Sequence, residues 1–299
     1  MKLLDILCSP WAIMPNRLTE IQEIYFTHLR GEKINIKEVE ARIGKPLENE
    51  DQGYEIENGV AVIPVQGVIA KRMNMFSRIS GGASTELIAR DLKSALEDPK
   101  VKSILLYIDS PGGSVDGTQE LANMIFEARD QKQIVAYTDG LMASAAYWIG
   151  SAAQKIYISG DTVQVGSIGV VAQHVDISKA EERVGVKTTE IVAGKYKRIA
   201  SRYAPLTEDG QKTLQEAVDY IYSVFVNDVA KFKGISEEKA LSMADGKVFI
   251  GKQAIEVGLV DGVQSLSGLI DRLGFINSTQ TIRAIVADRC KEVSHAVSQ

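Results

Sequence analysis

The sequence has few of the residues that most often bind metals or form disulfides. Its 299 residues include three histidines, His28, His174 and His295, and two cysteines, Cys8 and Cys290. The cysteines lie near opposite ends of the chain and fit no metal-ligand or redox spacing. They are typical of reduced thiols, which suits a cytoplasmic protein. No metal or organic cofactor is expected.

The sequence also lacks a basic tract and a long apolar run. A net charge of −5 and a pI near 5.4 argue against a nucleic-acid partner held through its phosphates. The apolar N-terminal residues are interrupted by Asp5 and end at Pro10. This run is shorter than the ~18 apolar residues that a membrane span needs. We therefore expect no membrane span and no signal peptide.

The composition that is present is that of an ordinary globular protein. Apolar residues make up 45% of a chain that is long enough for one large α/β domain with additions, or for two domains. Residues 1–55 are charged, carry helical patches and end in a polar run. They predict a helical surface appendage and a linker. The main domain is expected at 56–273, followed by a mobile tail at 274–299.

Strand and helix patterns alternate through the main domain and predict an α/β fold with a largely parallel sheet. The run 104–108 is apolar throughout, as expected of a strand that is covered on both faces. Ser84 and Thr207 precede amphipathic patterns and are predicted to cap helices. Further strands are expected at 60–67, 134–137, 155–159, 165–171 and 187–192.

The helix after Thr207 carries a wide aliphatic stripe. Its members are Leu214, Ala217, Val218, Ile221, Val224 and Phe225. A stripe of this width can contact a neighbouring subunit as well as the core of its own chain. The pattern is therefore compatible with a homo-oligomer.

The stretch 139–151 presents a serine. An apolar strand ends at an Asp-Gly pair, and small residues then surround Ser144 before a helical pattern begins. A hydroxyl at the first turn of a helix leaves room for a substrate carbonyl, and the next backbone N–H points to where negative charge would develop. Tyr147 and Trp148 follow this serine and are expected to pack in the core.

Two further stretches supply the partners that a nucleophilic serine needs. The turn 109–114, Asp-Ser-Pro-Gly-Gly-Ser, can offer backbone N–H groups with no Cβ in the way. Lys195 and Lys197 follow an apolar pair, and a lysine can act as a base once burial disfavours its charged form. His174 is the histidine best placed to be a base, but it is expected to bond within its own turn.

Four stretches occur in one order and at consistent spacing. They are residues 109–114, Met-Ala-Ser-Ala-Ala-Tyr-Trp at 142–148, Val-Gly-Ser-Ile-Gly-Val at 165–170 and Gly-Lys-Tyr-Lys at 194–197. Together they resemble the signal peptide peptidase A family (SppA, peptidase family S49) of serine peptidases, over about residues 60–272. The resemblance implies a ClpP/crotonase-like fold and a homo-oligomeric serine endopeptidase.

The resemblance also implies a role for each matching residue. Ser144 would be the nucleophile, and Lys197, in a Tyr-Lys pair, would be the base of a Ser-Lys dyad. Ser167 would orient the lysine. Three backbone N–H groups would form the oxyanion hole, those of Gly113, Ala145 and Gly112.

The sequence departs from the family pattern in two respects, one in the pocket and one in the biological setting. Ala145 and Ala146 stand where members often have glycine, which puts the width of the pocket in doubt but keeps the backbone N–H. Members that clear signal peptides usually carry a membrane segment, and none is expected here. The chain is in this respect similar to the head-maturation proteases of tailed phages and prophages. The implied partners are polypeptide substrates, such as phage scaffold, portal or coat proteins, in the host cytosol or the assembling capsid.

Three alternatives stay open on the sequence. They are a cytosolic SppA-type peptidase that degrades signal peptides or oligopeptides, a crotonase-type acyl-CoA enzyme, and an inactive scaffold that binds phage structural proteins. A crotonase would need a carboxylate base and a CoA site, and it leaves the pairing of Ser144 with Lys197 unexplained. For a peptidase, the small residues around Ser144 predict cleavage after small or aliphatic residues.

Overall fold

The computed structural model describes residues 10–19, 53–72 and 82–275. A six-stranded sheet forms the centre, in the order β13-β10-β8-β6-β3-β2. Its strands are β2 (Glu55–Glu57), β3 (Val60–Gln66), β6 (Ser103–Asp109), β8 (Gln133–Thr138), β10 (Lys155–Ile158) and β13 (Gly262–Val263). All neighbouring pairs are parallel except β2 with β3. The predicted α/β fold with a largely parallel sheet is confirmed.

Both faces of the central sheet are covered, because successive side chains of a strand point to opposite faces. On one face, Ile104 and Leu106 of β6 belong to the core cluster shared with the helices that cross the sheet. On the other face, Leu105 packs with Leu269 and Leu273 of the helical residues 266–275. The helices of the first face are α5 (Thr85–Glu97), α6 (Thr118–Ala128), α7 (Ala145–Ser151) and α9 (Glu208–Lys233).

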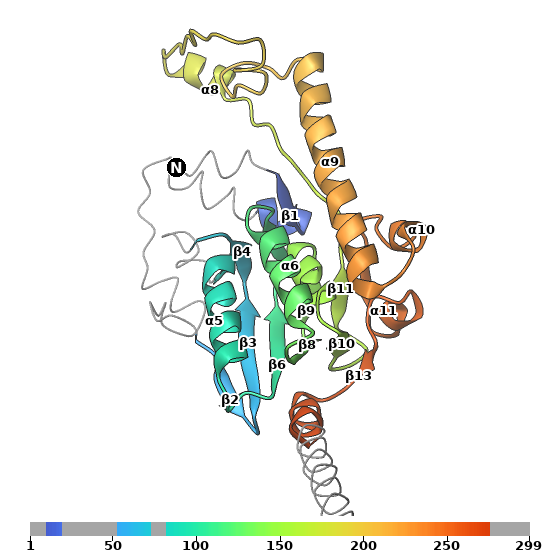
Figure 1. Ribbon diagram of the computed structural model, residues 1–299. Coiled ribbons are helices and arrows are strands. Elements are labelled where there is room, and N and C mark those ends of the chain that lie inside the picture. Colours follow the sequence, from blue (N-terminus) through green and yellow to red (C-terminus); the bar gives the residue numbers. More distant parts are fainter. Residues whose placement is uncertain (1–9, 20–52, 73–81, 276–299) are drawn as a thin grey trace, which may run out of the picture.

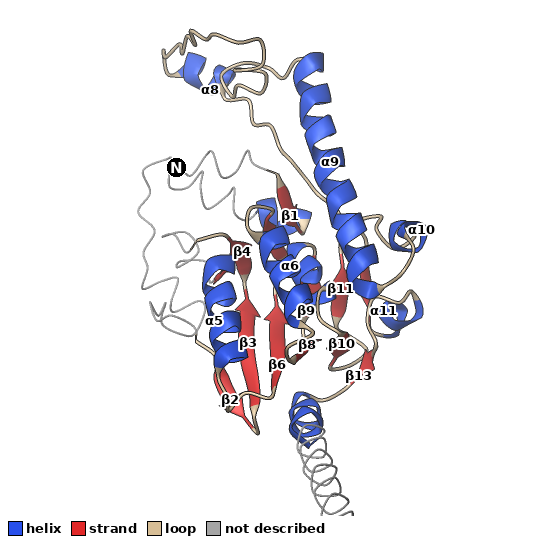
Figure 2. Ribbon diagram, viewed as in Figure 1, coloured by secondary structure: helices blue, strands red, loops and turns tan. Residues whose placement is uncertain are grey.

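Two small sheets continue the central sheet at the carboxyl ends of its strands (Figure 2). The first has the order β1-β7-β4-β5 and the second the order β12-β11-β9. Short turns lead from β3 to β4, from β6 to β7 and from β8 to β9. These strands are β1 (Trp11–Ile13), β4 (Val68–Ala70), β5 (Gly82–Ser84), β7 (Gly112–Ser114), β9 (Leu141–Ala143), β11 (Gln164–Gly166) and β12 (Val248–Ile250).

The predicted helix caps are confirmed. The Ser84 hydroxyl accepts a hydrogen bond from the N–H of Leu87 at 3.3 Å, and that of Thr207 accepts one from Gly210 at 3.1 Å. Short helices complete the fold at α8 (Ser178–Arg183), α10 (Glu237–Leu241) and α11 (Lys252–Glu256). Within the described ranges, no helix combines the length and the apolar character needed to cross a bilayer.

Two predicted strands differ from the structure. The strand expected at 165–171 ends at Gly166, because Ser167 takes a positive φ of 52° and turns the chain. Residues 187–192 form no strand. Among the described residues no strand lies beside this run, and Ile191 is 97% exposed.

The predicted appendage and tail fall largely outside the described residues, at 1–9, 20–52 and 276–299. The described residues of the predicted appendage do not lie on the surface as a separate unit but pair with strands of the main domain. Trp11–Ile13 are buried and form β1, which pairs with β7 of the main domain. Helical structure is described from Pro15 to Thr19. Glu55–Glu57 already belong to the central sheet.

Candidate active site

Ser144 lies in a strained turn between β9 and α7. Its backbone has φ 56° and ψ −120°, and the residue is 1% exposed. Its N–H donates to the carbonyl of Gly166 at 2.7 Å, and its hydroxyl lies 3.4 Å from the carbonyl oxygen of Gly169. A non-glycine residue at positive φ is costly and persists where surrounding contacts fix it. These contacts therefore fix the position of the serine.

Ser167 lies beside this turn on the neighbouring strand. β9 and β11 are parallel, and Ala143 pairs with Gly166, so Ser144 and Ser167 directly follow paired residues. Ser167 also has a positive φ, and its N–H donates to the carbonyl of Lys247 at 2.7 Å. The structure thus brings the two predicted serines together. The role of Ser167 toward a lysine stays a prediction.

Gly112 and Gly113 lie so close to neighbouring backbone segments that neither position has room for a side chain. Gly112 has a φ of 100°, and a Cβ there would lie 2.9 Å from the Cβ of Ser144. A Cβ on Gly113 would collide with the carbonyl oxygen of Ile69 and would lie 2.6 Å from the carbonyl carbon of that residue. The N–H of Gly112 donates to the hydroxyl of Ser110 at 3.2 Å. This bond engages one of the three predicted oxyanion donors.

Ala145, the third predicted donor, is the first residue of α7. The first N–H groups of an α-helix have no carbonyl partner within the helix. The N–H of Ala145 follows the Ser144 turn directly. The site therefore combines a buried hydroxyl with backbone donors from a glycine strand and from a helix start.

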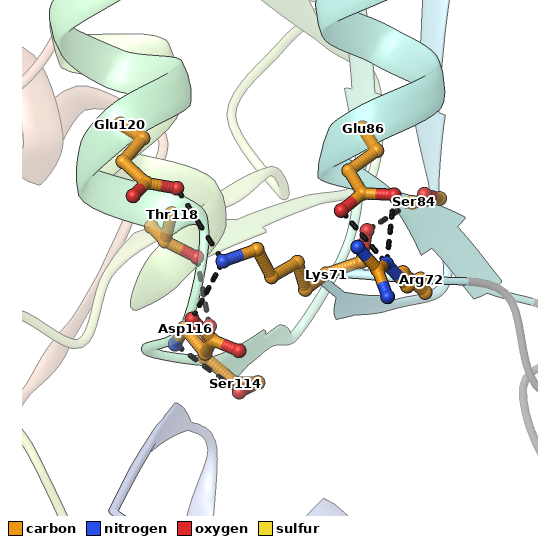
Figure 3. A network of polar contacts seen from close by, with 8 residues as sticks. All are labelled: Lys71, Arg72, Ser84, Glu86, Ser114, Asp116, Thr118 and Glu120. Carbon is orange, nitrogen blue, oxygen red and sulfur yellow. Dashed lines mark hydrogen bonds and ion pairs between the residues drawn. The ribbon is translucent and has the colours of Figure 1, made fainter.

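A polar network connects β4 with the turn after β7 (Figure 3). The Nζ of Lys71 lies 3.2 Å from a carboxylate oxygen of Asp116 and 3.8 Å from one of Glu120. The hydrogen bond to Asp116 raises the pKa of Lys71. Thr118 donates to the carbonyl of Ser114 at 2.8 Å. The ion pairs connect the end of β4 with the turn after β7. Because they are exposed, they contribute little to the stability of the fold.

The helix that follows Ser144 is anchored in the core. Trp148 stacks on Phe225 with ring centroids 4.4 Å apart. The hydroxyl of Tyr147 donates to the carbonyl of Leu259 at 2.9 Å, and burial raises the pKa of this phenol. The expectation that both aromatic residues serve packing is confirmed.

The structure does not bring the predicted base to Ser144 within one chain. Lys197 lies in the segment between α8 and α9, which stands away from the sheets beside the N-terminal end of α9 (Figure 1). There its N–H donates to the carbonyl of Gly194 at 3.1 Å. We call residues 174–207 the extension. Lys195 belongs to it too, with its Nζ 3.9 Å from a carboxylate oxygen of Asp209.

His174 also bonds within the extension. Its Nε2 lies 3.0 Å from the carbonyl oxygen of Ser201. The expectation that this histidine bonds within its own turn is wrong, because its partner lies 27 residues further along the chain. In the described residues, no group of three His, Cys, Asp or Glu side chains could hold a metal ion.

One segment at the site was missed by the sequence interpretation. The carbonyl oxygen of Ala12, in β1, lies against Gly112 and would clash with any Cβ there. The available signal was the apolar run Trp11–Ile13 between Pro10 and Pro15. Such a run is typical of a short strand with a defined beginning and end.

A buried serine in a strained turn, at the head of a helix and beside a glycine strand, is the arrangement of enzymes that attack carbonyl groups with a serine. The chain belongs to Peptidase family S49, whose sequence profile matches residues 127–279. That range includes Ser144, Ser167 and Lys197.

Named relatives agree with this family. The chain is 32% identical to Capsid assembly protease C of Escherichia phage lambda, over 77% of this chain and 53% of that protein. It is 32% identical to Head-tail preconnector protein GP5 of Enterobacteria phage P21, over 73% of this chain and 43% of the relative. It is 33% identical to Putative signal peptide peptidase SppA of Enterococcus faecium, over 72% of this chain and 62% of that relative. The chain spans about half the length of the two phage relatives.

Proposed function

We propose that this protein is a serine endopeptidase in which Ser144 is the nucleophile and Lys197 is the base. The observation that carries the proposal is the strained, buried Ser144 beside Gly112 and the first turn of α7. Membership of Peptidase family S49 supports it. A ClpP/crotonase-like fold remains a prediction that is compatible with the parallel sheet.

The proposed chemistry needs no cofactor. Neutral Lys197 takes the proton of the Ser144 hydroxyl as Oγ attacks a peptide carbonyl. The N–H groups of Gly113 and Ala145 stabilise the resulting oxyanion. The lysine ammonium then protonates the leaving amine, and an acyl-enzyme forms on Ser144. Water hydrolyses this ester by the same steps and restores the serine.

In this proposal Lys197 reaches the Ser144 of a second copy in a homo-oligomer. The extension carries exposed apolar side chains, with Val184 75% and Ile191 97% exposed. Tyr220, in the first half of α9, is 72% exposed, and the aliphatic stripe of that half is only partly covered in one chain. Exposed apolar surface of this kind is typical of a contact with another protein. A site shared between copies explains why one chain keeps the serine and the lysine apart.

The proposed substrates are phage capsid or scaffold proteins, cleaved in the host cytosol or in the assembling capsid. The names of the two phage relatives support this setting. Inside a shell the local concentration of such proteins is high, so modest intrinsic affinity suffices. Degradation of signal peptides is the second candidate, and the similarity to the SppA relative favours it.

Complementation tests the shared site. Ser144→Ala and Lys197→Ala should each abolish peptide cleavage, whereas a mixture of the two, dissociated and reassembled together, should regain activity. The regained sites combine an intact serine from one copy with an intact lysine from another. Lys195→Ala is the matched control and should retain activity. A fully active Lys197→Ala would remove the lysine from the mechanism. A mixture that stays inactive, although the two variants assemble together, would show that the site is not shared between copies.

Two further measurements separate the alternatives. A serine-directed phosphonate should label Ser144, and protection of that residue by coenzyme A would favour the acyl-CoA enzyme instead. Co-expression with the neighbouring scaffold and coat proteins should yield one trimmed protein, which stays full-length with Ser144→Ala. If Ser144 stays unlabelled, and if wild type and Ser144→Ala give identical particle proteins, the inactive scaffold is favoured.

A further inference from the structure

Residues 10–14 run through the candidate active site as an additional strand. β1 is antiparallel to β7, with Ala12 opposite Gly113 and Ile13 opposite Gly112. On its other side, Trp11 exchanges two hydrogen bonds of 2.8 Å with Val171. β1 is therefore a middle strand, with β7 on one side and the chain that follows Ser167 on the other.

The register directs the carbonyl of Ala12 toward the proposed oxyanion donor. The N–H of Met14 donates to the carbonyl of Pro111 at 3.0 Å. Hydrogen-bonded pairs alternate along an antiparallel ladder, so the pair two residues away, Ala12 with Gly113, is again of the hydrogen-bonded type. In such a pair the N–H of Gly113 faces the carbonyl of Ala12.

The same carbonyl lies close to the nucleophile. A Cβ built on Gly112 has the carbonyl oxygen of Ala12 as its nearest atom and the Cβ of Ser144 as its next, at 2.9 Å. Trp11, Ala12 and Ile13 are all buried, as is Ser144 itself. The segment therefore covers the serine and occupies both hydrogen-bonding edges that an extended substrate would use.

We propose that residues 10–14 are a built-in inhibitor that lies in the substrate groove as a substrate-like strand, and that the groove opens when this segment leaves. Ala12 takes the place of the substrate residue whose carbonyl Ser144 attacks. The inference rests on the proposed peptidase function. Because the inhibitor is part of the same chain, its effective concentration at the groove is high. The apparent affinity for substrate is the intrinsic affinity multiplied by the fraction of molecules whose groove is open.

A reversible crosslink tests whether the segment must leave. Trp11 and Ser114 face each other as a non-hydrogen-bonded pair, with the short Cα separation that a disulfide needs. Trp11→Cys and Ser114→Cys are introduced together, with Cys8 and Cys290 both replaced by Ser. The oxidised protein should cleave peptides at least about tenfold more slowly than the reduced one. Ser114→Cys alone is the control and should be insensitive to oxidant.

Equal cleavage by the oxidised and the reduced protein would overturn the proposal. So would an N-terminus at Ile13 in the purified protein, because the segment would then be a substrate that has been cut. A reduced protein that cleaves nothing, and whose control also cleaves nothing, would count against the peptidase function itself.

Amide hydrogen exchange tests the occupancy without any catalysis. In Ser144→Ala, the N–H groups of Trp11 and Met14 should exchange slowly. A saturating synthetic peptide with the sequence of residues 9–15 should speed their exchange and leave Gly113 and Val171 protected. Binding of the peptide with unchanged slow exchange at Trp11 and Met14 would show that the groove lies elsewhere. Fast exchange of these two N–H groups in the free protein would show that the segment does not occupy the groove.

Discussion

The indole nitrogen of Trp148 donates a hydrogen bond to the carboxylate of Asp228 at 3.0 Å, and this bond connects the helix that begins after Ser144 to α9. Gln119 of α6 donates to the same carboxylate oxygen at 3.1 Å. Asp228 is buried. One carboxylate thus holds three helices around the turn that presents the serine.

Asp228→Ala should therefore destabilise the fold by about 2 kcal/mol, because two donors lose their acceptor in a buried place. Asp228→Asn keeps an oxygen at the same position and should cost less than half of this. The free energy of unfolding in urea measures both. Equal losses for the two variants would show that the carboxylate geometry, and not the acceptor, is what matters.

Gly112→Ala should abolish cleavage. The new Cβ would lie 2.9 Å from the Cβ of Ser144 and 3.0 Å from the carbonyl oxygen of Ala143, at a φ of 100° that alanine rarely adopts. The serine or the strand must then shift, and a displacement of about 1 Å can cost ~100-fold in rate. Gly160→Ala is the control, because a Cβ there meets nothing within 4 Å. An active Gly112→Ala would place the reacting carbonyl away from this strand.

The sequence was informative where local pattern and local packing agree. The alternating faces of β6 and the caps at Ser84 and Thr207 depend on residues within a few positions of each other. The central strands lie in a core that their own apolar runs create. The pattern alone was therefore enough to predict the largely parallel sheet and the two helix starts.

The remainder depends on contacts between residues that are distant in sequence. Trp11–Ile13 form a strand because β7 offers an edge about one hundred residues later, and strand preference depends on such pairing. Residues 187–192 are predicted as a strand, but they pair with no strand in the described part of the chain, and Ile191 stays exposed. Likewise, the position of Lys197 relative to Ser144 cannot follow from the motif spacing, because the extension carries the lysine away from the sheets.

Tyr107 should make the stability depend on alkaline pH. Burial first, and then its hydrogen bonds to the Asp139 carboxylate, raise the pKa of Tyr107 from 10.0 to about 12. The unfolded chain thus loses the phenol proton at a lower pH than the folded chain does. The stabilisation is complete below pH 10 and is lost as the pH rises from there to about 12.

Tyr107→Phe removes this titration. Its free energy of unfolding should be lower than that of the wild type near neutral pH, since the bond to Asp139 is lost, and should fall less steeply above pH 10. Denaturation in urea at a series of pH values measures the two slopes. Parallel curves for both proteins would assign the alkaline loss to other groups.

Substrate selection should follow the site that Ala12 occupies. Ala12 is completely buried, and its carbonyl oxygen lies against Gly112, beside Ser144. We expect peptides with the sequence Pro-Trp-Xaa-Ile-Met to be cleaved after Xaa when Xaa is alanine, glycine or serine. Bulky aromatic residues should lower kcat/KM by about tenfold or more, and charged residues by more still, because burial would leave the charge unpaired.

The measurement is a peptide series that varies Xaa alone, with the reduced Trp11→Cys/Ser114→Cys protein as the enzyme. A second series varies the proline two positions before Xaa and serves as the control, which should change the rates much less. A preference for lysine, arginine, aspartate or glutamate at Xaa would contradict the assignment of this site. Equal sensitivity in both series would mean that the register of bound substrate differs from that of β1.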